Sequence, residues 1–150
     1  MGGLGLVDAS TDVEARELAK AFYRNGRGFL RAASDPVADN ARDICYSLAI
    51  ASELVLKSFL LTRDWNDDRC RCEIRHDLER GLACVAAAGL DGLPDDFSYV
   101  VGVLNAYYPK HAFMDFAVPP GDPAFVARAR STVVDVYKLV GRHVRSTGGA

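Results

Sequence analysis

The sequence lacks both a long apolar run and a strong excess of one charge. Its 150 residues carry 18 Lys and Arg against 20 Asp and Glu, which gives a net charge of −2. A basic field over the whole molecule is therefore excluded, and a nucleic-acid partner would need a local basic patch. Apolar runs such as Leu48–Ala51 fall far short of the roughly 18 residues that cross a bilayer, so we expect no membrane contact.

The sequence also lacks a disulfide framework, a signal peptide and a phosphate-binding loop. Cys70 and Cys72 are two residues apart, while Cys45 and Cys84 fall within apolar helical patterns. We therefore expect reduced thiols and a cytoplasmic protein. Residues 1–6 have neither a basic region nor the long apolar region of a signal peptide. Glycine-rich nucleotide loops are absent as well, and we expect no cofactor.

What the sequence does contain is helical periodicity. No segment alternates with period two between turns, so we expect an all-α fold, an up-and-down bundle of about five helices. The expected organisation is a flexible segment at 1–10, one helical domain at 11–145 and a flexible tail at 146–150. The expected helices cover residues 11–33, 36–61, 76–88, 94–107 and 122–144.

Helix boundaries are suggested by three local signals. Thr11–Glu14 matches a capping box. Asp35 and Pro36 fit the N-cap and the first position of the second helix. Gly89 followed by Leu90 is typical of a Schellman stop. Residues 109–120 have no helical period and are predicted to form a loop that packs onto the bundle through its aromatic residues.

Two apolar faces are predicted from the 3.6-residue period. On the first helix, the expected inner face is Leu18, Phe22, Asn25 and Phe29. On the second helix, the expected stripe is Ile44, Leu48, Ala51, Val55 and Phe59. Because the second helix has further apolar residues on its other sides, we expect it to be central and buried.

Polar residues in and after this apolar helix are the first candidates for a site. Glu53 and Lys57 are four residues apart in the favourable order for an ion pair. They form either a pair near the surface or part of a buried polar cluster in which Lys57 reaches His76 or Asp77. Asp77 suits the first turn of a helix. His76 is either a cap or an acid–base group, because the imidazole pKa lies near neutrality.

Arginines precede His76, and Arg71 is separated from it by four residues. A guanidinium beside an imidazole suits phosphodiester chemistry, because the first binds phosphate and the second transfers a proton. The alternative is that Arg63–Arg80, with five arginines and six acids, is an ordinary solvated surface. Cys70 and Cys72 before His76 hint at zinc, but a second ligand pair is missing, so we expect no metal.

Two helices carry clustered positive charge. On the first, five basic residues recur every three or four positions, so they share one face: Arg16, Lys20, Arg24, Arg27 and Arg31. The last helix adds Arg128, Arg130, Lys138, Arg142 and Arg145. This pattern is either a solvated face or a local patch that follows a phosphate backbone. On the second interpretation, Arg24 and Arg27 are ligand-binding residues.

The segments Glu53–Leu61 and His76–Leu82, followed by Leu104–Tyr108, resemble HEPN domains, the higher-eukaryote and prokaryote nucleotide-binding helical bundles. The resemblance covers roughly residues 15–118. It implies a bundle of four or five helices that forms homodimers. Many members of this family are RNases, and often toxins paired with a nucleotidyltransferase antitoxin. Their active site is an Arg followed after four to six residues by His, a spacing that Arg71 and His76 satisfy.

Three hypotheses for function follow. The first is a homodimeric accessory module that binds nucleotide or RNA without catalysis, with Glu53, Lys57, His76, Asp77 and the basic first helix at the ligand. The second is a metal-independent endoribonuclease of the toxin type, in which Arg71 binds phosphate and His76 is the acid or base. The third is a structural partner of a nucleotidyltransferase in a toxin–antitoxin-like pair.

Overall fold

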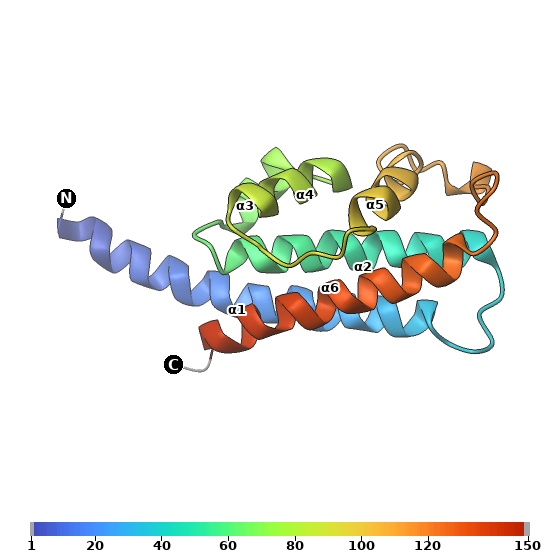
Figure 1. Ribbon diagram of the computed structural model, residues 1–150. Coiled ribbons are helices and arrows are strands. Elements are labelled where there is room, and N and C mark those ends of the chain that lie inside the picture. The colour runs from blue at the N-terminus through green and yellow to red at the C-terminus, as the bar shows by residue number, and fades with distance from the viewer. Residues whose placement is uncertain (1, 149–150) are drawn as a thin grey trace.

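The computed structural model describes the backbone of residues 2–148 and the side chains of residues 12–146. This part of the chain contains six α-helices, one short 3-10 helix and no strand, so the all-α prediction is confirmed (Figure 1). The elements are α1 (Gly2–Ala33), α2 (Ala41–Leu61), α3 (Asp67–Glu73), α4 (Leu78–Ala87), α5 (Phe97–Asn105), η1 (Phe113–Asp115) and α6 (Phe125–Gly148).

The central helix of the bundle is α2. It contacts α1, α4, α5 and α6, and Figure 1 shows α1 and α6 on one side of it and α3, α4 and α5 on the other. α1 and α2 run in opposite directions, as expected for an up-and-down bundle, but α6 runs in the same direction as α2 (Figure 1). The parallel pair arises because the chain between α2 and α6 first folds into a second layer.

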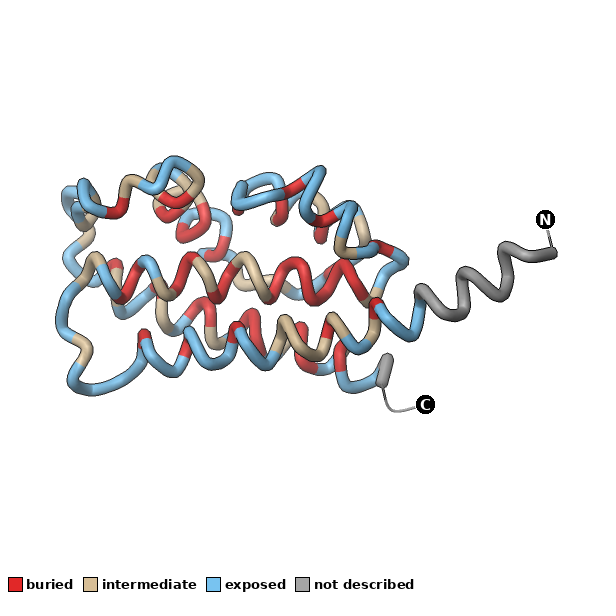
Figure 2. Tube along the Cα trace, turned by 180° about the vertical axis from the view of Figure 1, so that it is seen from behind, coloured by how far each residue is buried: buried red, intermediate tan, exposed pale blue. Residues whose placement is uncertain are grey.

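The centre of the core is formed by α2. Its predicted stripe is buried along its whole length (Figure 2). By length and composition α2 could also cross a membrane, but 78% of its most apolar stretch is buried inside the bundle. Neighbouring helices therefore cover the apolar sides of α2, as they do for a core helix.

Close packing of α1 against α6 depends on two glycine–tyrosine contacts. Gly26 on α1 faces Tyr137, and Gly141 on α6 faces Tyr23, and a Cβ atom at either glycine would overlap the tyrosine hydroxyl. The Tyr137 hydroxyl donates to the carbonyl of Ala51 at 2.6 Å. The Tyr23 hydroxyl donates to the carbonyl of Tyr137 at 2.9 Å. The glycines thus allow both hydroxyls to reach backbone acceptors between the helices.

The first and last helices are longer than predicted. α1 begins at Gly2, so the predicted start at Thr11 is wrong. Residues 2–10 contain no proline, and a helix that is already nucleated extends through glycine at a cost of only about 1 kcal/mol per residue. The cap expected from the Thr11 side chain lies outside the described residues. α6 ends at Gly148 rather than at Val144.

The buried face of α1 also differs from the predicted one. Asn25 and Phe29 are exposed, whereas small residues face the core, together with Leu30: Ala15, Ala19, Gly26 and Ala33. The prediction gave weight to large apolar side chains. α1 instead packs through small residues, which allow its backbone to approach α2 and α6 closely.

The start of α2 is a second correction. Asn40 is the N-cap, and its side chain accepts hydrogen bonds from the amides of Arg42 and Asp43. Asp35 and Pro36 therefore do not begin this helix. The Asp35 carboxylate accepts from the amide of Val37 at 3.0 Å, a local turn that competes with helix initiation.

The chain between the predicted second and third helices contains a further helix, α3, which was not predicted. The side chain of Asn66 caps it by accepting from the amide of Arg69 at 2.8 Å. Three apolar residues anchor this segment to the bundle, because Trp65, Cys70 and Ile74 are all buried. Because the segment is short and has few apolar residues, its sequence shows no helical period.

The end of α4 and the loop after α5 agree with the sequence, whereas α5 and α6 begin three residues later than predicted. The Gly89 amide donates to Ala86 and the Leu90 amide to Val85, which is the predicted Schellman pair. The loop after α5 packs onto the bundle through Phe113, which is buried in η1.

Candidate functional site

A nearly buried ion pair lies within α2. Lys57 Nζ is 3.0 Å from Glu53 Oε2, and the side chains are only 7% and 11% exposed. Lys57 Nζ also donates to the backbone carbonyl of Arg75 at 2.6 Å. The predicted contact from Lys57 to His76 or Asp77 is thus replaced by one to the preceding carbonyl. The backbone of Arg75 is in the left-handed conformation, with φ of 55°. The hydrogen bond from Lys57 stabilises the position of its carbonyl.

Glu53 connects this ion pair to His76. His76 Nδ1 lies 2.7 Å from Glu53 Oε1, and Nδ1 is the donor because a carboxylate paired with Lys57 can only accept. The His76 side chain is 55% exposed. The carboxylate therefore fixes the ring and its tautomer, and in the neutral ring the proton-accepting nitrogen is Nε2. This arrangement suits an acid–base group.

Tyr108 is the third hydrogen-bond partner of Glu53. Its hydroxyl donates to Glu53 Oε1 at 2.8 Å, and its ring packs edge-on against His76 with centroids 5.7 Å apart. Burial, followed by the charge of Glu53, raises the pKa of the Tyr108 hydroxyl. Tyr108 therefore stays protonated and acts as a hydrogen-bond donor that positions the carboxylate. We refer to Glu53, Lys57, His76 and Tyr108 as the His76 cluster.

Asp77 has a structural role beside this cluster. It is the N-cap of α4 and accepts from the amide of Arg80. Asn105 from α5 donates to Asp77 at 3.0 Å and accepts from the amide of Leu78 at 2.7 Å. The predicted ligand-binding role of Asp77 is untested, but its carboxylate is engaged in joining the start of α4 to the end of α5.

A second histidine lies close to His76. The ring centroids of His76 and His111 are 6.3 Å apart, and His111 is exposed. The φ of His111 is 54°, which is uncommon for a residue other than glycine. The two imidazoles are thus on one surface and near enough to contact the same ligand.

Arg71 interacts with acidic residues of its own helix. Its side chain is 67% exposed on α3, where it pairs with Asp68 and with Asp67 at 3.5 Å. The hydrogen bond to Asp68, followed by the charge of Asp67, raises the pKa of the Arg71 guanidinium. Within the described residues, no hydrogen bond or ion pair joins Arg71 to His76, and their catalytic pairing stays a prediction.

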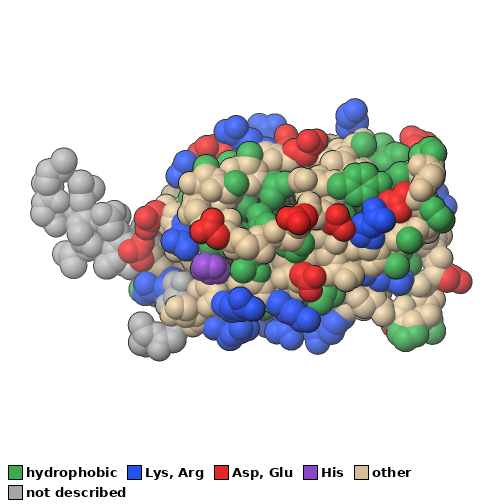
Figure 3. All heavy atoms as spheres, viewed as in Figure 1, with side chains coloured by type: hydrophobic (Ala, Val, Ile, Leu, Met, Phe, Trp, Pro, Cys, Tyr) green, Lys and Arg blue, Asp and Glu red, His purple; other side chains and the backbone are tan. Residues whose placement is uncertain are grey.

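The predicted basic patch becomes a groove between α1 and α6, which we call the α1–α6 groove. Figure 3 shows Lys and Arg side chains gathered along the edge of the molecule where these helices lie. The groove has a volume of about 540 Å³, and its lining has four basic side chains and no acidic one. The basic residues are Arg27, Lys138, Arg142 and Arg145, and Tyr23 and Tyr137 lie among them.

Other basic residues of the two helices are engaged elsewhere. Arg24 lines a neighbouring hollow with Phe29 and Leu54 rather than the groove. Arg130 donates to the carbonyl of Ala33 at 2.7 Å and so caps the end of α1. Arg128 pairs with Asp122 at 3.2 Å. The patch is therefore narrower than the sequence suggested.

Sequence reasoning missed Tyr108 and His111 as neighbours of His76, and Asn105 as a partner of Asp77. The only sequence signal was the segment Leu104–Tyr108, which figured in the family resemblance but carried no assigned role. Among the side chains at 12–146, no group of three His, Cys, Asp or Glu is arranged to hold a metal ion.

No family model, curated protein or solved structure matches this chain. Function is therefore inferred from the geometry of the His76 cluster and of the α1–α6 groove.

Proposed function

We propose that the protein is a HEPN-like module that binds RNA or nucleotide phosphates in the α1–α6 groove. The observation that carries this proposal is the lining of the groove, in which four basic residues lie around two tyrosines without a carboxylate. Within the described side chains, none of these four basic residues forms an ion pair. Their charges are therefore available to a phosphate backbone, which binds by releasing counterions.

The partly exposed Tyr23 ring supports single-stranded nucleic acid as the ligand. The Arg27 guanidinium lies 5.8 Å from its centre, and the buried Tyr137 ring packs behind it, with ring centroids 5.3 Å apart. Aromatic rings beside basic side chains are the usual elements of single-strand binding, because bases stack while phosphates pair. The net charge of −2 keeps this attraction local to the groove.

The binding test is fluorescence anisotropy with labelled single-stranded RNA over a range of salt. The double variant Lys138→Ala and Arg142→Ala should weaken binding. It should also reduce the slope of log affinity against log salt by about 0.7 for each lost phosphate contact. The matched control is Arg31→Ala with Lys110→Ala, which removes the same charge outside the groove. Equal loss in both double variants, or no binding at low salt, would refute the proposal.

A second function, metal-independent RNA cleavage, is favoured by one observation. The exposed His76 ring is held by the buried Glu53 carboxylate, and His111 lies beside it. Two imidazoles on one surface could act as acid and base in phosphodiester cleavage. The His76 cluster lies where α2 meets the α4–α5 layer, whereas α1 and α6 cover the other side of α2 (Figure 1).

The cleavage test uses labelled RNA with EDTA present. If the second function is correct, His76→Ala should abolish cleavage while leaving RNA retention by the α1–α6 groove unchanged. Arg71→Ala tests whether cleavage also requires the arginine that the family resemblance implies, or only the two imidazoles. Absence of cleavage by the wild type would remove the enzymatic hypothesis, and a co-purifying nucleotidyltransferase would then support the role of a structural partner.

The proposal includes a homodimer. Phe29 is 39% exposed and lines an open hollow with Arg24 and Leu54 between α1 and α2. Covering this apolar surface with a second copy would bury it from water. Light scattering should therefore give twice the chain mass of 16.3 kDa, and Phe29→Glu should give the mass of one chain. A wild-type monomer would contradict this part of the proposal.

A further inference from the structure

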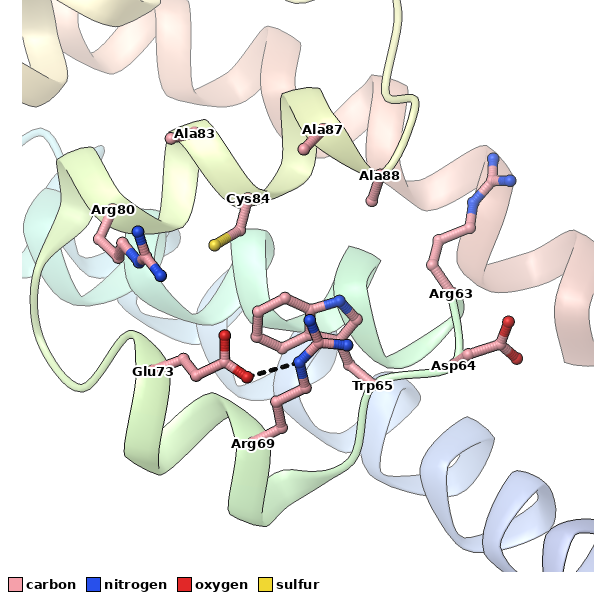
Figure 4. Close-up of a pocket in the computed structure, with 10 residues that line it drawn as sticks. All are labelled: Arg63, Asp64, Trp65, Arg69, Glu73, Arg80, Ala83, Cys84, Ala87 and Ala88. Atoms are coloured by element: carbon pink, nitrogen blue, oxygen red, sulfur yellow. Dashed lines mark hydrogen bonds and ion pairs between the residues drawn. The ribbon is translucent and has the colours of Figure 1, made fainter.

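A further hollow lies away from both surfaces considered above. It has a volume of about 710 Å³ and is lined by residues 63–65, which follow α2, and by residues of α3 and of α4 with its C-cap. Figure 4 shows α4 along one side of it and α3 along the other, with Trp65 and Arg69 between them. None of its lining residues belongs to the α1–α6 groove or to the His76 cluster.

A planar stack forms one wall of this hollow. The Arg69 guanidinium lies 3.8 Å from the centre of the Trp65 ring, and its Nε is 2.6 Å from a carboxylate oxygen of Glu73. Trp65 therefore covers one face of the guanidinium and Glu73 fixes its edge (Figure 4). The Arg69 side chain is still 48% exposed. A guanidinium held in this way can stack an aromatic ring on its free face.

Small residues and unpaired arginines complete the hollow. Ala83, Ala87 and Ala88 of α4 contribute methyl groups to its lining, which leave room for an apolar ring. Arg63 and Arg80 also line it, and within the described side chains neither forms an ion pair. Glu73 is already paired with Arg69, and the Arg63 guanidinium lies 5.0 Å from the centre of the Phe59 ring. Arg80 is therefore the guanidinium that remains to pair with an anion in the hollow.

We infer that this hollow binds a small aromatic anion, a flat ring that carries a carboxylate or a phosphate group. The ring stacks on Arg69 and lies against the alanines of α4. The anionic group pairs with Arg80, whose planar fork matches carboxylate and phosphate oxygens. This site is independent of RNA binding in the α1–α6 groove.

The chain provides its own reporter for this test. Trp65 is the only tryptophan, so a change in its fluorescence reports directly on the hollow. We would titrate the full chain with phenyl phosphate, benzoate and adenosine monophosphate, with phenol as the neutral analogue and inorganic phosphate as the anion without a ring. Saturable quenching by at least one aromatic anion, and weaker binding of phenol and of inorganic phosphate, is the expected result.

Variants then separate the ring contact from the charge contact. Arg80→Gln should weaken binding of the anion by about tenfold, which corresponds to about 1.4 kcal/mol, and should leave the affinity for phenol unchanged. Arg71→Gln is the matched control, since it removes the same charge from α3 outside the hollow. Equal effects of both variants would overturn the inference.

Cysteine labelling gives a second reading that does not depend on fluorescence. Cys84 lines the hollow and is partly exposed, whereas Cys72 is exposed and lies outside it. A bound aromatic anion should slow alkylation of Cys84 and leave that of Cys72 unchanged. If no probe alters either Trp65 fluorescence or Cys84 labelling, or if phenol and inorganic phosphate bind as tightly as phenyl phosphate, the hollow is not an aromatic anion site.

The preference among the three probes identifies the source of the anion. Tightest binding of benzoate indicates an aromatic carboxylate, and tightest binding of phenyl phosphate indicates an aryl phosphate. Preference for adenosine monophosphate indicates a free nucleotide, and the RNA affinity of the Arg80→Gln variant should then be unchanged. These three outcomes all support the inference, while loss of RNA binding in Arg80→Gln would show that the hollow is part of the RNA surface instead.

Discussion

At the scale of single residues, Glu53 is the polar centre of the protein. It accepts from Lys57, His76 and Tyr108, and it is almost wholly enclosed. A carboxylate in such a position is tolerated only because every partner is present. The position of His76 therefore depends on residues that themselves have no access to a ligand.

Removal of the Glu53 charge should be costly. Glu53→Gln leaves Lys57 charged and nearly buried, so the free energy of unfolding should fall by about 3 kcal/mol. The double variant Glu53→Gln with Lys57→Met should recover part of this loss, because an apolar side chain then replaces the unpaired charge. Urea denaturation measures both effects.

The exposed pair of Glu17 and Lys20 provides the control for this prediction. Its atoms are 3.4 Å apart on the surface of α1, and Glu17→Gln should change stability by less than about 0.5 kcal/mol. Similar losses of unfolding free energy for Glu17→Gln and Glu53→Gln would show that burial does not determine how much stability the ion pair contributes.

Cysteine reactivity should follow burial. Burial raises the pKa of the Cys45 thiol to about 12 and that of the Cys70 thiol to about 11. Because the thiolate is the reactive form, Cys72 should react first with a thiol reagent at pH 8, and Cys45 and Cys70 only after unfolding. Replacing Cys72 with Ser should remove the fastest phase and leave the slower reaction of the partly exposed Cys84. A fastest phase that persists at its original rate would contradict this assignment.

The same thiols make stability depend on pH. Their folded pKa values lie above the unfolded value of 9.0, so the unfolded chain loses protons first as the pH rises. Their contribution is complete below pH 9 and is lost as the pH increases toward 11 and 12. The denaturation midpoint should fall over this range, and a constant midpoint would contradict the burial of both thiols.

At the scale of elements, two glycines in one helix have opposite roles. A Cβ at Gly26 would overlap the Tyr137 hydroxyl, whereas nothing lies within 4 Å of a Cβ at Gly28. Gly26→Ala should therefore destabilise the protein by about 1–3 kcal/mol, as for an overpacked core. Gly28→Ala should stabilise it by about 0.5–1 kcal/mol through helix propensity.

Thermal unfolding of the two alanine variants tests this difference directly. The midpoint should move down for Gly26→Ala and up for Gly28→Ala. Changes of the same sign in both variants would mean that the contact with Tyr137 does not limit the packing of α1 on α6.

At the scale of the whole molecule, the bundle is organised around one helix. Contacts of α2 with α1, α4, α5 and α6 place it in every layer of the core. Amide hydrogens in the middle of α2 should therefore exchange with solvent only on global unfolding. Exchange in the loop at 109–121 should be much faster, since it has few backbone hydrogen bonds.

Hydrogen exchange followed by mass spectrometry checks this prediction. Protection in α2 should match the free energy of unfolding measured by denaturant. Faster exchange in α2 than in α4 would show that the two layers open separately and that α2 does not join them.

The fold could be predicted in outline because its information is local. The buried stripe of α2 and the stop at Gly89 each depend on residues within one or two helical turns. The errors also have physical causes. Asp35 forms a turn instead of a cap, α3 has too few apolar residues to show a period, and α1 packs through alanine and glycine that carry little hydrophobic signal.

The sequence alone determined that the protein is an all-α bundle with α2 at its centre, because apolar periodicity depends only on residue spacing. It also identified Glu53, Lys57 and His76 as candidates, because charges within an apolar helix require partners. Only the tertiary structure decided which partners they have. It placed Glu53 between Lys57, His76 and Tyr108 and brought His111 beside His76, since these contacts join segments far apart in the chain.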